Sequence, residues 1–177
     1  MTERTVTLYE ILESRENRVR RQEELLLEFG GVLISVTLNI PGSVKDRPSY
    51  RKALRMGIEM LKKKLPEGRI LHIEVRELPT GAEAYFIVDG MTASEVKRIT
   101  VEIEDSSSIG RLFDMDVLAE KGSVSRVDLG MQSRRCLLCS EDAKICARTQ
   151  RHSIDELLTE IDRILEMSLP RKIEEIN

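Results

Sequence analysis

The sequence predicts an α+β fold: one domain over residues 1–177, with a mixed, largely antiparallel sheet flanked by helices. Three segments with apolar residues at helical spacing begin with a capping box, a Ser or Thr followed three residues later by Glu. Residues 32–40 alternate between apolar and more polar side chains, which is typical of a strand. Short turns rich in Gly, Pro or Ser join further strand-like segments. Together these patterns favour hairpins packed against helices.

Helices and strands alternate in the first half of the chain. The capping box of Thr7 and Glu10 begins the first helix, and a glycine pair ends it. Pro-Gly and Pro-Thr-Gly turns bound the strand-like segments that follow. In chain order, we expect a helix from the Thr7 cap to Gly30-Gly31, a strand over 32–40, a helix ending at about Lys64, and hairpin strands over 70–78 and 83–88.

Two capping boxes mark helix starts in the second half of the chain: Thr92 with Glu95, and Ser153 with Glu156. The second of them begins the last clear helix pattern. Between them, the serine-rich turn 106–108 separates two apolar segments that we interpret as a second hairpin. In chain order, we expect a short helix after Thr92, strands over 100–104 and 111–118, a short helix opening at Ser140, a helix after Ser153, and a frayed tail over 168–177.

Composition narrows the classes of protein that the chain can belong to. Hydrophobic residues make up 41% and charged residues 33%, so a packed core is expected. No apolar segment is long enough to span a bilayer, and no signal peptide is evident at the amino terminus. A net charge of −3 and 3% aromatic residues argue against nucleic-acid binding. Three clustered cysteines are no disulfide framework and indicate a reducing, cytoplasmic setting.

The segment Gly110 to Val117 carries the strongest chemical signal. Its two carboxylates, Asp114 and Asp116, stand two residues apart in a predicted strand and therefore project from the same side, roughly 7 Å apart. Like charges held so close need a cation, a proton or an arginine to neutralise them. Mg²⁺ takes oxygen ligands from one or two carboxylates and from substrate phosphates. The pair therefore predicts a magnesium site.

Two further acids could join this pair. The second predicted hairpin places Glu102 and Glu104 beside Asp114 and Asp116, so that up to four carboxylates could converge. One could then act as a general base while two hold the metal. For the glutamates alone, the solvent face of an amphipathic strand is the interpretation that we favour.

Basic side chains lie on both sides of the acids in the sequence, and guanidinium groups pair well with phosphate oxygens. Lys45 follows the turn at Pro41-Gly42, where backbone amides could also meet a ligand, although the turn lacks the pattern of a Walker loop. The candidates for phosphate binding are Lys45, Arg111, Arg126, Arg134 and Arg135.

A third group consists of Cys136, Cys139, Cys146 and His152. These four side chains could bind tetrahedral Zn²⁺, but their spacing is loose compared with known zinc fingers. Cysteine is also a common buried residue. We favour a reduced, partly buried cluster over zinc, and both over a thioredoxin-like redox site.

Together these segments resemble the family of apo-citrate lyase phosphoribosyl-dephospho-CoA transferases. The most specific matches are residues 110–117 (GRLFDMDV) and 134–139 (RRCLLC). Further matching segments are Glu13 to Arg18 with Gln22, Asn39 to Gly42 with Lys45, Ser125-Arg126, Cys146 to Arg148, and His152-Ser153.

The resemblance implies a nucleotidyltransferase-like fold and reaction. The donor would be 2′-(5″-triphosphoribosyl)-3′-dephospho-CoA, and the acceptor a serine of the citrate lyase acyl carrier protein, its gamma subunit. Pyrophosphate would leave as the serine hydroxyl attacks the α-phosphorus. Asp114 and Asp116 would hold Mg²⁺, with Arg111, Arg126, Arg134 and Arg135 as phosphate ligands; the resemblance leaves the general base open.

Three interpretations follow from the sequence. The leading one is a Mg²⁺-dependent transferase that modifies a carrier protein and uses neither nucleic acid nor a membrane. A zinc-stabilised binding module built on the cysteine cluster is the second. The third is a related nucleotidyltransferase for another carrier, such as a malonate decarboxylase subunit. The basic residues of the first two helices, Arg15 and Arg18 among them, are candidates for docking an acidic carrier.

Overall fold

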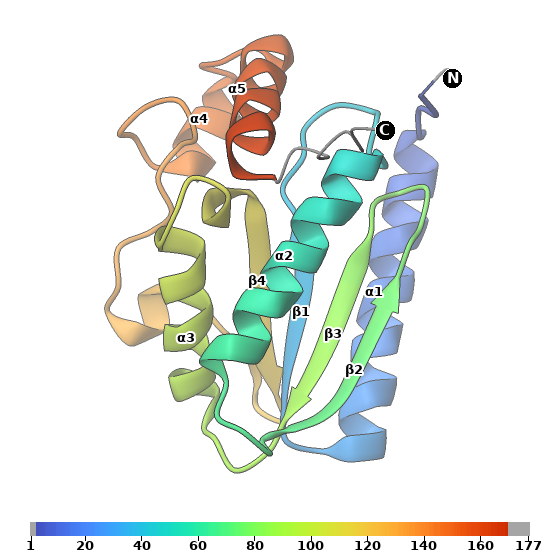
Figure 1. The fold of residues 1–177 in the computed structure, drawn as a ribbon, viewed down its shortest axis with the longest axis vertical. Helices are drawn as coiled ribbons and strands as arrows, with labels where there is room; N and C mark the ends of the chain where they lie inside the picture. The colour runs from blue at the N-terminus through green and yellow to red at the C-terminus, as the bar shows by residue number, and fades with distance from the viewer. Residues whose placement is uncertain (1–2, 170–177) are drawn as a thin grey trace, which may run out of the picture.

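A computed structural model describes residues 3–169 of the chain (Figure 1). The described residues form both helices and strands. The elements are α1 (Leu8–Phe29), β1 (Val32–Leu38), α2 (Pro48–Lys64), β2 (Ile70–Arg76), β3 (Glu83–Val88), α3 (Ala93–Asp105), the 3₁₀ turn η1 (Gly110–Leu112), β4 (Phe113–Ala119), β5 (Gly122–Val124), the 3₁₀ turn η2 (Val127–Leu129), α4 (Ala143–Thr149) and α5 (Ile154–Ser168).

The five strands form one sheet in the order β2-β3-β1-β4-β5. Each described pair of neighbours is antiparallel, so the sheet is not mixed within this part of the chain. Helices α2 and α3 cover one face of the sheet, α1 lies across the other, and α4 and α5 sit at one end (Figure 1). The predicted fold class is confirmed.

The main core lies between the sheet and helices α2, α3 and α5. Val32, Ile34 and Val36 point into it from β1, because alternate side chains of a strand share a face. A smaller cluster around Leu25 and Leu33 joins α1 to the opposite face. The three predicted capping boxes are all present and begin α1, α3 and α5. The first hairpin is also confirmed as β2 and β3.

The predicted strand over residues 100–104 is wrong, because these residues belong to α3. Their β-branched side chains suggested a strand, but such preferences are weak against tertiary packing. Val96, Ile99, Thr100 and Ile103 recur at helical spacing, and this row packs on the sheet. Glu102 and Glu104 therefore reach their positions from a helix rather than from a hairpin.

The other predicted boundaries differ by a few residues. The strand expected over 111–118 begins at Phe113, after η1, and the short helix expected at Ser140 begins at Ala143, because Asp142 caps it. Of the tail expected to be frayed over 168–177, Ser168 belongs to α5 and Leu169 caps this helix. The remaining residues, 170–177, lie outside the described part of the chain. Within residues 3–169, the structure has no helix whose length and apolar character would suit a membrane span.

Side chains from α3 occupy the outer edge of β4. Strand β5 pairs only with the last residues of β4, so the backbone of Met115 has no neighbouring strand on that side. Glu104 accepts a hydrogen bond from the Met115 amide over 2.9 Å, and Lys97 donates one to its carbonyl oxygen over 2.8 Å. Both side chains are buried. Helix α3 thus supplies the hydrogen bonds that a missing strand would have made.

Gly110 allows α3 and β4 to approach closely. A Cβ atom at this position would lie 2.3 Å from the carbonyl oxygen of Ile103 and 2.9 Å from that of Glu104. These atoms belong to the backbone of α3 and cannot move aside as a flexible side chain can. The glycine that begins the GRLFDMDV segment is therefore required by packing.

Glu104→Ala should lower the free energy of unfolding by about 3 kcal/mol or more, because it removes one member of a buried ion pair and leaves the Met115 amide without an acceptor. Denaturant titration of the purified variant measures this loss. Glu102→Ala is the matched control in the same helix: its exposed pair with Lys64 is worth less than about 1 kcal/mol. Equal losses in both variants would contradict the role of Glu104.

Candidate functional site

Asp114 and Asp116 project from the same face of β4, as predicted. Phe113, Met115 and Val117 are buried in the core, and the two aspartates between them are exposed on the side that α1 partly covers. Their backbones stand opposite polar residues of β1: Thr37 faces Asp114, and Ser35 faces Asp116. The acid pair therefore lies on a polar part of the sheet.

Electrostatic conditions around the pair favour a bound cation. The protein around Asp116 displaces water and raises the pKa of its carboxyl, and the charge of Asp114 raises it further, whereas Lys97 and Arg18 oppose the rise. Asp114 has Arg134 as a partner, with 3.8 Å between its Oδ1 and the guanidinium Nη1. Another positive charge at this position would offset the repulsion between the carboxylates.

A cavity of about 160 Å³ opens beside Asp114 and contains several cationic side chains. Lys45, Arg15 and Arg18 line it, together with Asn39 at the end of β1. The ammonium of Lys45 is partly buried and donates a hydrogen bond to the carbonyl oxygen of Ile40. Burial lowers the pKa of Lys45, and the nearby charge of Arg15 lowers it further. An anion bound in this cavity would stabilise the charged form of Lys45 and so oppose both causes of its lowered pKa.

Arg15 and Arg18 differ in how far they are engaged. Arg18 Nε donates to the buried carboxylate of Glu83 over 2.9 Å, so the ion pair fixes this side chain next to the sheet. Among residues 3–169, neither Arg15 nor Lys45 has a carboxylate within ion-pair distance. The sequence had suggested Arg15 and Arg18 only as parts of a docking surface, since helical spacing does not show which face meets a cavity.

A larger cavity of about 570 Å³ lies on the other side of Asn39, which lines both cavities. Its walls include the predicted phosphate ligands Arg111, Arg134 and Arg135 and apolar side chains of α5, such as Leu157 and Ile161. The combination of arginines and apolar surface suits a ligand that has both phosphate and hydrophobic parts. Arg134 lines this cavity and also faces Asp114.

The predicted phosphate ligands have different surroundings. Arg111 Nη2 donates to the carbonyl oxygens of Arg135 and Cys136, over 3.0 and 2.6 Å. Arg134 donates to the carbonyl oxygen of Phe113 and lies 3.6 Å from Glu104. Among the described hydrogen bonds, the guanidinium of Arg135 donates only to the side chain of Gln132, over 3.5 Å. Arg111 and Arg134 are thus held in place by backbone atoms.

Arg126 pairs with two acids of α3 and, among the described ion pairs, not with Asp114 or Asp116. Its guanidinium pairs with Glu104 at 2.6 Å and with Asp105 at 2.8 Å. Burial disfavours the charged form of Arg126, but the hydrogen bonds that its guanidinium donates to these two carboxylates raise its pKa overall. The convergence of four carboxylates that a hairpin could have produced does not occur, because Glu102 pairs with Lys64 on the exposed side of α3 and Glu104 accepts from the Met115 amide of β4 and from Arg126. The solvent-face interpretation favoured for the two glutamates is right for Glu102 and wrong for Glu104, which is buried.

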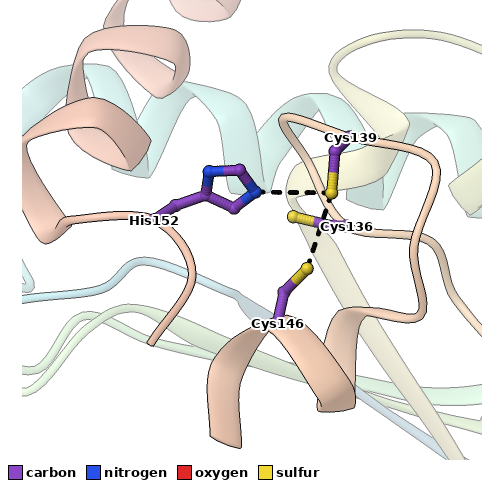
Figure 2. A group of neighbouring side chains, drawn as sticks. All are labelled: Cys136, Cys139, Cys146 and His152. Atoms are coloured by element: carbon purple, nitrogen blue, oxygen red, sulfur yellow. Dashed lines mark hydrogen bonds between the residues drawn. The ribbon is translucent and has the colours of Figure 1, made fainter. Parts of the chain in front are cut away.

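The three cysteines and His152 come together at the other end of the site (Figure 2). Their ligand atoms all lie within 4.8 Å of one another. The sulfur of Cys139 lies 3.5 Å from that of Cys146 and 3.3 Å from His152 Nε2. This group could hold a metal ion, as one of the sequence interpretations required.

Local backbone structure explains this convergence. Residues 134–143 form a tight hairpin, closed by hydrogen bonds from Cys136 N to Glu141 O and from Ala143 N to Arg134 O. Helix α4 then carries Cys146. Gln150, in the left-handed conformation with φ of 47°, ends this helix and turns the chain so that His152 faces the cysteines.

Comparisons with known proteins place the chain in a family. A sequence model of the family described as "Apo-citrate lyase phosphoribosyl-dephospho-CoA transferase" matches residues 6–168. A protein of Streptococcus pyogenes serotype M5, named "Probable apo-citrate lyase phosphoribosyl-dephospho-CoA transferase", is 36% identical over 166 residues, which cover 91% of this chain and 86% of the relative. A protein of Vibrio cholerae serotype O1 with the same name is 34% identical over 163 residues, covering 90% of this chain and 92% of the relative.

A longer relative matches in the same way. The "Protein CitXG" of Haemophilus influenzae is 35% identical over 162 residues, which cover 90% of this chain but 35% of that protein. The family model and these relatives define an enzyme of the transferase class. The chain belongs to the family of apo-citrate lyase phosphoribosyl-dephospho-CoA transferases. A metal at the cysteine cluster would therefore belong to an enzyme and not to a binding module.

Asp116→Asn should make the protein more stable at about pH 8, and this gain should fall as the pH decreases toward the ordinary aspartate pKa of about 4. The reason is the raised pKa of Asp116: its ionised form opposes folding, and protonation removes the penalty. Denaturant titrations at several pH values measure the difference, with Asp89→Asn, in an exposed turn, as the control for net charge. A gain that does not change with pH would contradict the prediction.

Proposed function

We propose that this enzyme transfers the phosphoribosyl-dephospho-CoA group from 2′-(5″-triphosphoribosyl)-3′-dephospho-CoA to a serine of the citrate lyase acyl carrier protein and releases pyrophosphate. The observation that carries the proposal is the cavity beside Asp114, where Lys45 and Arg15 lie without a carboxylate partner among the described residues. Cations held in this way next to two carboxylates suit a polyphosphate with a metal ion.

The two cavities suit the two ends of this donor. Its triphosphate is strongly anionic and matches the cavity that contains Lys45 and Arg15. Its dephospho-CoA part has a nucleotide and a long, less polar arm, which match the larger cavity with its arginines and apolar walls. Asn39 and Arg134 stand where the two cavities adjoin the acid pair, so the scissile phosphate would lie near Asp114.

The proposed reaction is an in-line displacement at the α-phosphorus. The serine oxygen of the carrier forms a bond to this phosphorus while the bond to the pyrophosphate oxygen breaks, and the electron pair leaves with pyrophosphate. One of the two aspartates takes the serine proton, since Glu102 and Glu104 are engaged elsewhere by Lys64 and by the Met115 amide. Lys45 and Arg15 would stabilise the charge on the departing pyrophosphate.

The donor set at β4 fits Mg²⁺. Asp114 and Asp116 offer hard carboxylate oxygens from one strand face, and substrate phosphates and water can complete an octahedral shell. When bound, Mg²⁺ would supply Lewis-acid polarisation of the attacked phosphate. The chain itself orients the acids, holds Arg134 against the backbone of Phe113, and keeps Lys45 directed into the cavity.

The cysteines support a reducing cellular setting for this reaction. The chain has three cysteines, an odd number clustered within eleven residues, which is no disulfide framework. We infer a cytoplasmic enzyme, where thiols stay reduced.

Asp114→Asn and Asp116→Asn should each lower transfer activity by about 10²-fold or more, since each removes an anionic ligand worth several kcal/mol in the transition state. The assay incubates enzyme, triphosphoribosyl donor, apo carrier protein and Mg²⁺, and follows the mass gain of the carrier by mass spectrometry. Asp89→Asn should retain full activity. A folded and fully active Asp114 or Asp116 variant would exclude that residue from the site.

Lys45→Met should raise KM for the triphosphoribosyl donor by about 10-fold or more, because a hydrogen bond to a charged group contributes about 1.5–3 kcal/mol. Steady-state rates at varied donor and fixed carrier concentration measure this change. Lys52→Met, in the exposed face of α2, is the matched control and should leave KM unchanged. An unchanged KM in the Lys45 variant would place the triphosphate elsewhere.

A further inference from the structure

We propose that Cys136, Cys139, Cys146 and His152 bind one structural Zn²⁺ ion. This site is separate from the carboxylate pair and is not required by the proposed transfer chemistry. It reverses the interpretation favoured by the sequence, a reduced cluster without metal. Spacing along the chain looked loose because the distance that matters is set by a hairpin, a short helix and one left-handed residue.

The donor atoms have the identity and separation that Zn²⁺ needs. Three thiolates and one imidazole form a Cys₃His set, one of the common structural zinc sets. Zinc–sulfur bonds of about 2.3 Å in a tetrahedron place ligand atoms roughly 3.5–3.8 Å apart. The observed separations are 3.5 Å from Cys139 to Cys146 and 3.3 Å from Cys139 to His152, with all four atoms within 4.8 Å (Figure 2).

The four ligands come from three consecutive pieces of chain. Cys136 and Cys139 lie in the hairpin, Cys146 lies on α4, and His152 precedes the cap of α5. All side chains point toward a common centre, with His152 opposite the three sulfurs (Figure 2). Because four protein atoms would complete a tetrahedron, no position remains open for water, and the site is structural rather than catalytic.

The segment around the cluster needs such a crosslink. Between residues 120 and 153, the only buried residues are Cys136 and Cys146. Regular structure there is limited to β5, η2 and α4, of three, three and seven residues. A segment without a hydrophobic core of its own is usually held by disulfides or metal, and metal binding can supply that folding free energy.

Zinc would also fix one wall of the larger cavity. Cys136, Cys146 and His152 line it, and Arg111 donates to the carbonyl oxygen of Cys136. Thiolate ligands favour zinc over magnesium, because soft sulfur donors select soft or borderline metals. The two candidate metal positions would therefore bind different ions.

Metal analysis of the full chain, purified without chelators, tests the proposal. We expect about one zinc per chain and three thiols that react with a thiol reagent only after a strong chelator is added. The readout is clean because all three cysteines of the chain belong to the cluster. Protein with less than about a tenth of an equivalent of zinc, and with no uptake of added Zn²⁺, would overturn the proposal, as would a Cys139–Cys146 disulfide or stoichiometric iron.

Cobalt substitution and a pair of histidine variants identify the ligands. Co²⁺ bound by the wild type should give thiolate charge-transfer and tetrahedral d–d absorption. His152→Gln should weaken zinc affinity by about 10-fold or more and alter the cobalt spectrum. His72, the other histidine, lies in β2 and stacks on Phe29 of α1. His72→Gln should leave both the zinc affinity and the cobalt spectrum unchanged.

These measurements stay informative if a variant fails to fold, since cobalt uptake by the wild type alone can contradict the proposal. They need neither donor nor carrier protein. Failure of the zinc site would therefore leave the proposed transfer reaction standing, and loss of transfer activity in the aspartate variants would leave the zinc site standing.

Discussion

The contacts of the buried Glu104 carboxylate hold together the parts of the chain that surround the acid pair. This carboxylate accepts a hydrogen bond from the Met115 amide of β4 and forms an ion pair with Arg126. Its Oε1 also lies 3.6 Å from Nη2 of Arg134. One buried group thus connects α3, the strand that carries the acid pair, and the segment that leads to the cysteines. Burying a charge is costly unless it is paired and hydrogen-bonded, and here each requirement is met by a different part of the chain.

Charge is distributed unevenly around the acid pair. Arg18, Arg126 and Arg134 are engaged by carboxylates or backbone, whereas Lys45 and Arg15 border a cavity without such partners among the described residues. Maintaining like charges near one another lowers stability, and functional sites often carry such a cost in exchange for affinity for a charged ligand. The family to which the chain belongs is named for the transfer of a phosphoribosyl-dephospho-CoA group, which carries phosphates.

Sequence reasoning succeeded where local rules decide the structure. The capping boxes, the alternation in β1 and the shared face of Asp114 and Asp116 follow from spacing alone. It was wrong for residues 100–104, where a helical row and a strand-like alternation coexist and packing decides between them. The cavity side of Arg15 and the convergence of the cysteines were beyond its reach, because both depend on how distant segments meet. Gln150 shows this best: one left-handed residue determines where His152 points, and no pattern indicates it.

The side chains along the outer edge of β4 have a consequence for how a protein partner can approach the aspartates. Many proteins recognise an extended peptide by adding it as a further strand to an open sheet edge. Here Lys97 and Glu104 occupy both backbone groups of Met115, and Arg134 occupies the carbonyl of Phe113. This rim is closed to β-augmentation. A protein acceptor therefore cannot reach the aspartates by adding a strand beside Phe113 and Met115.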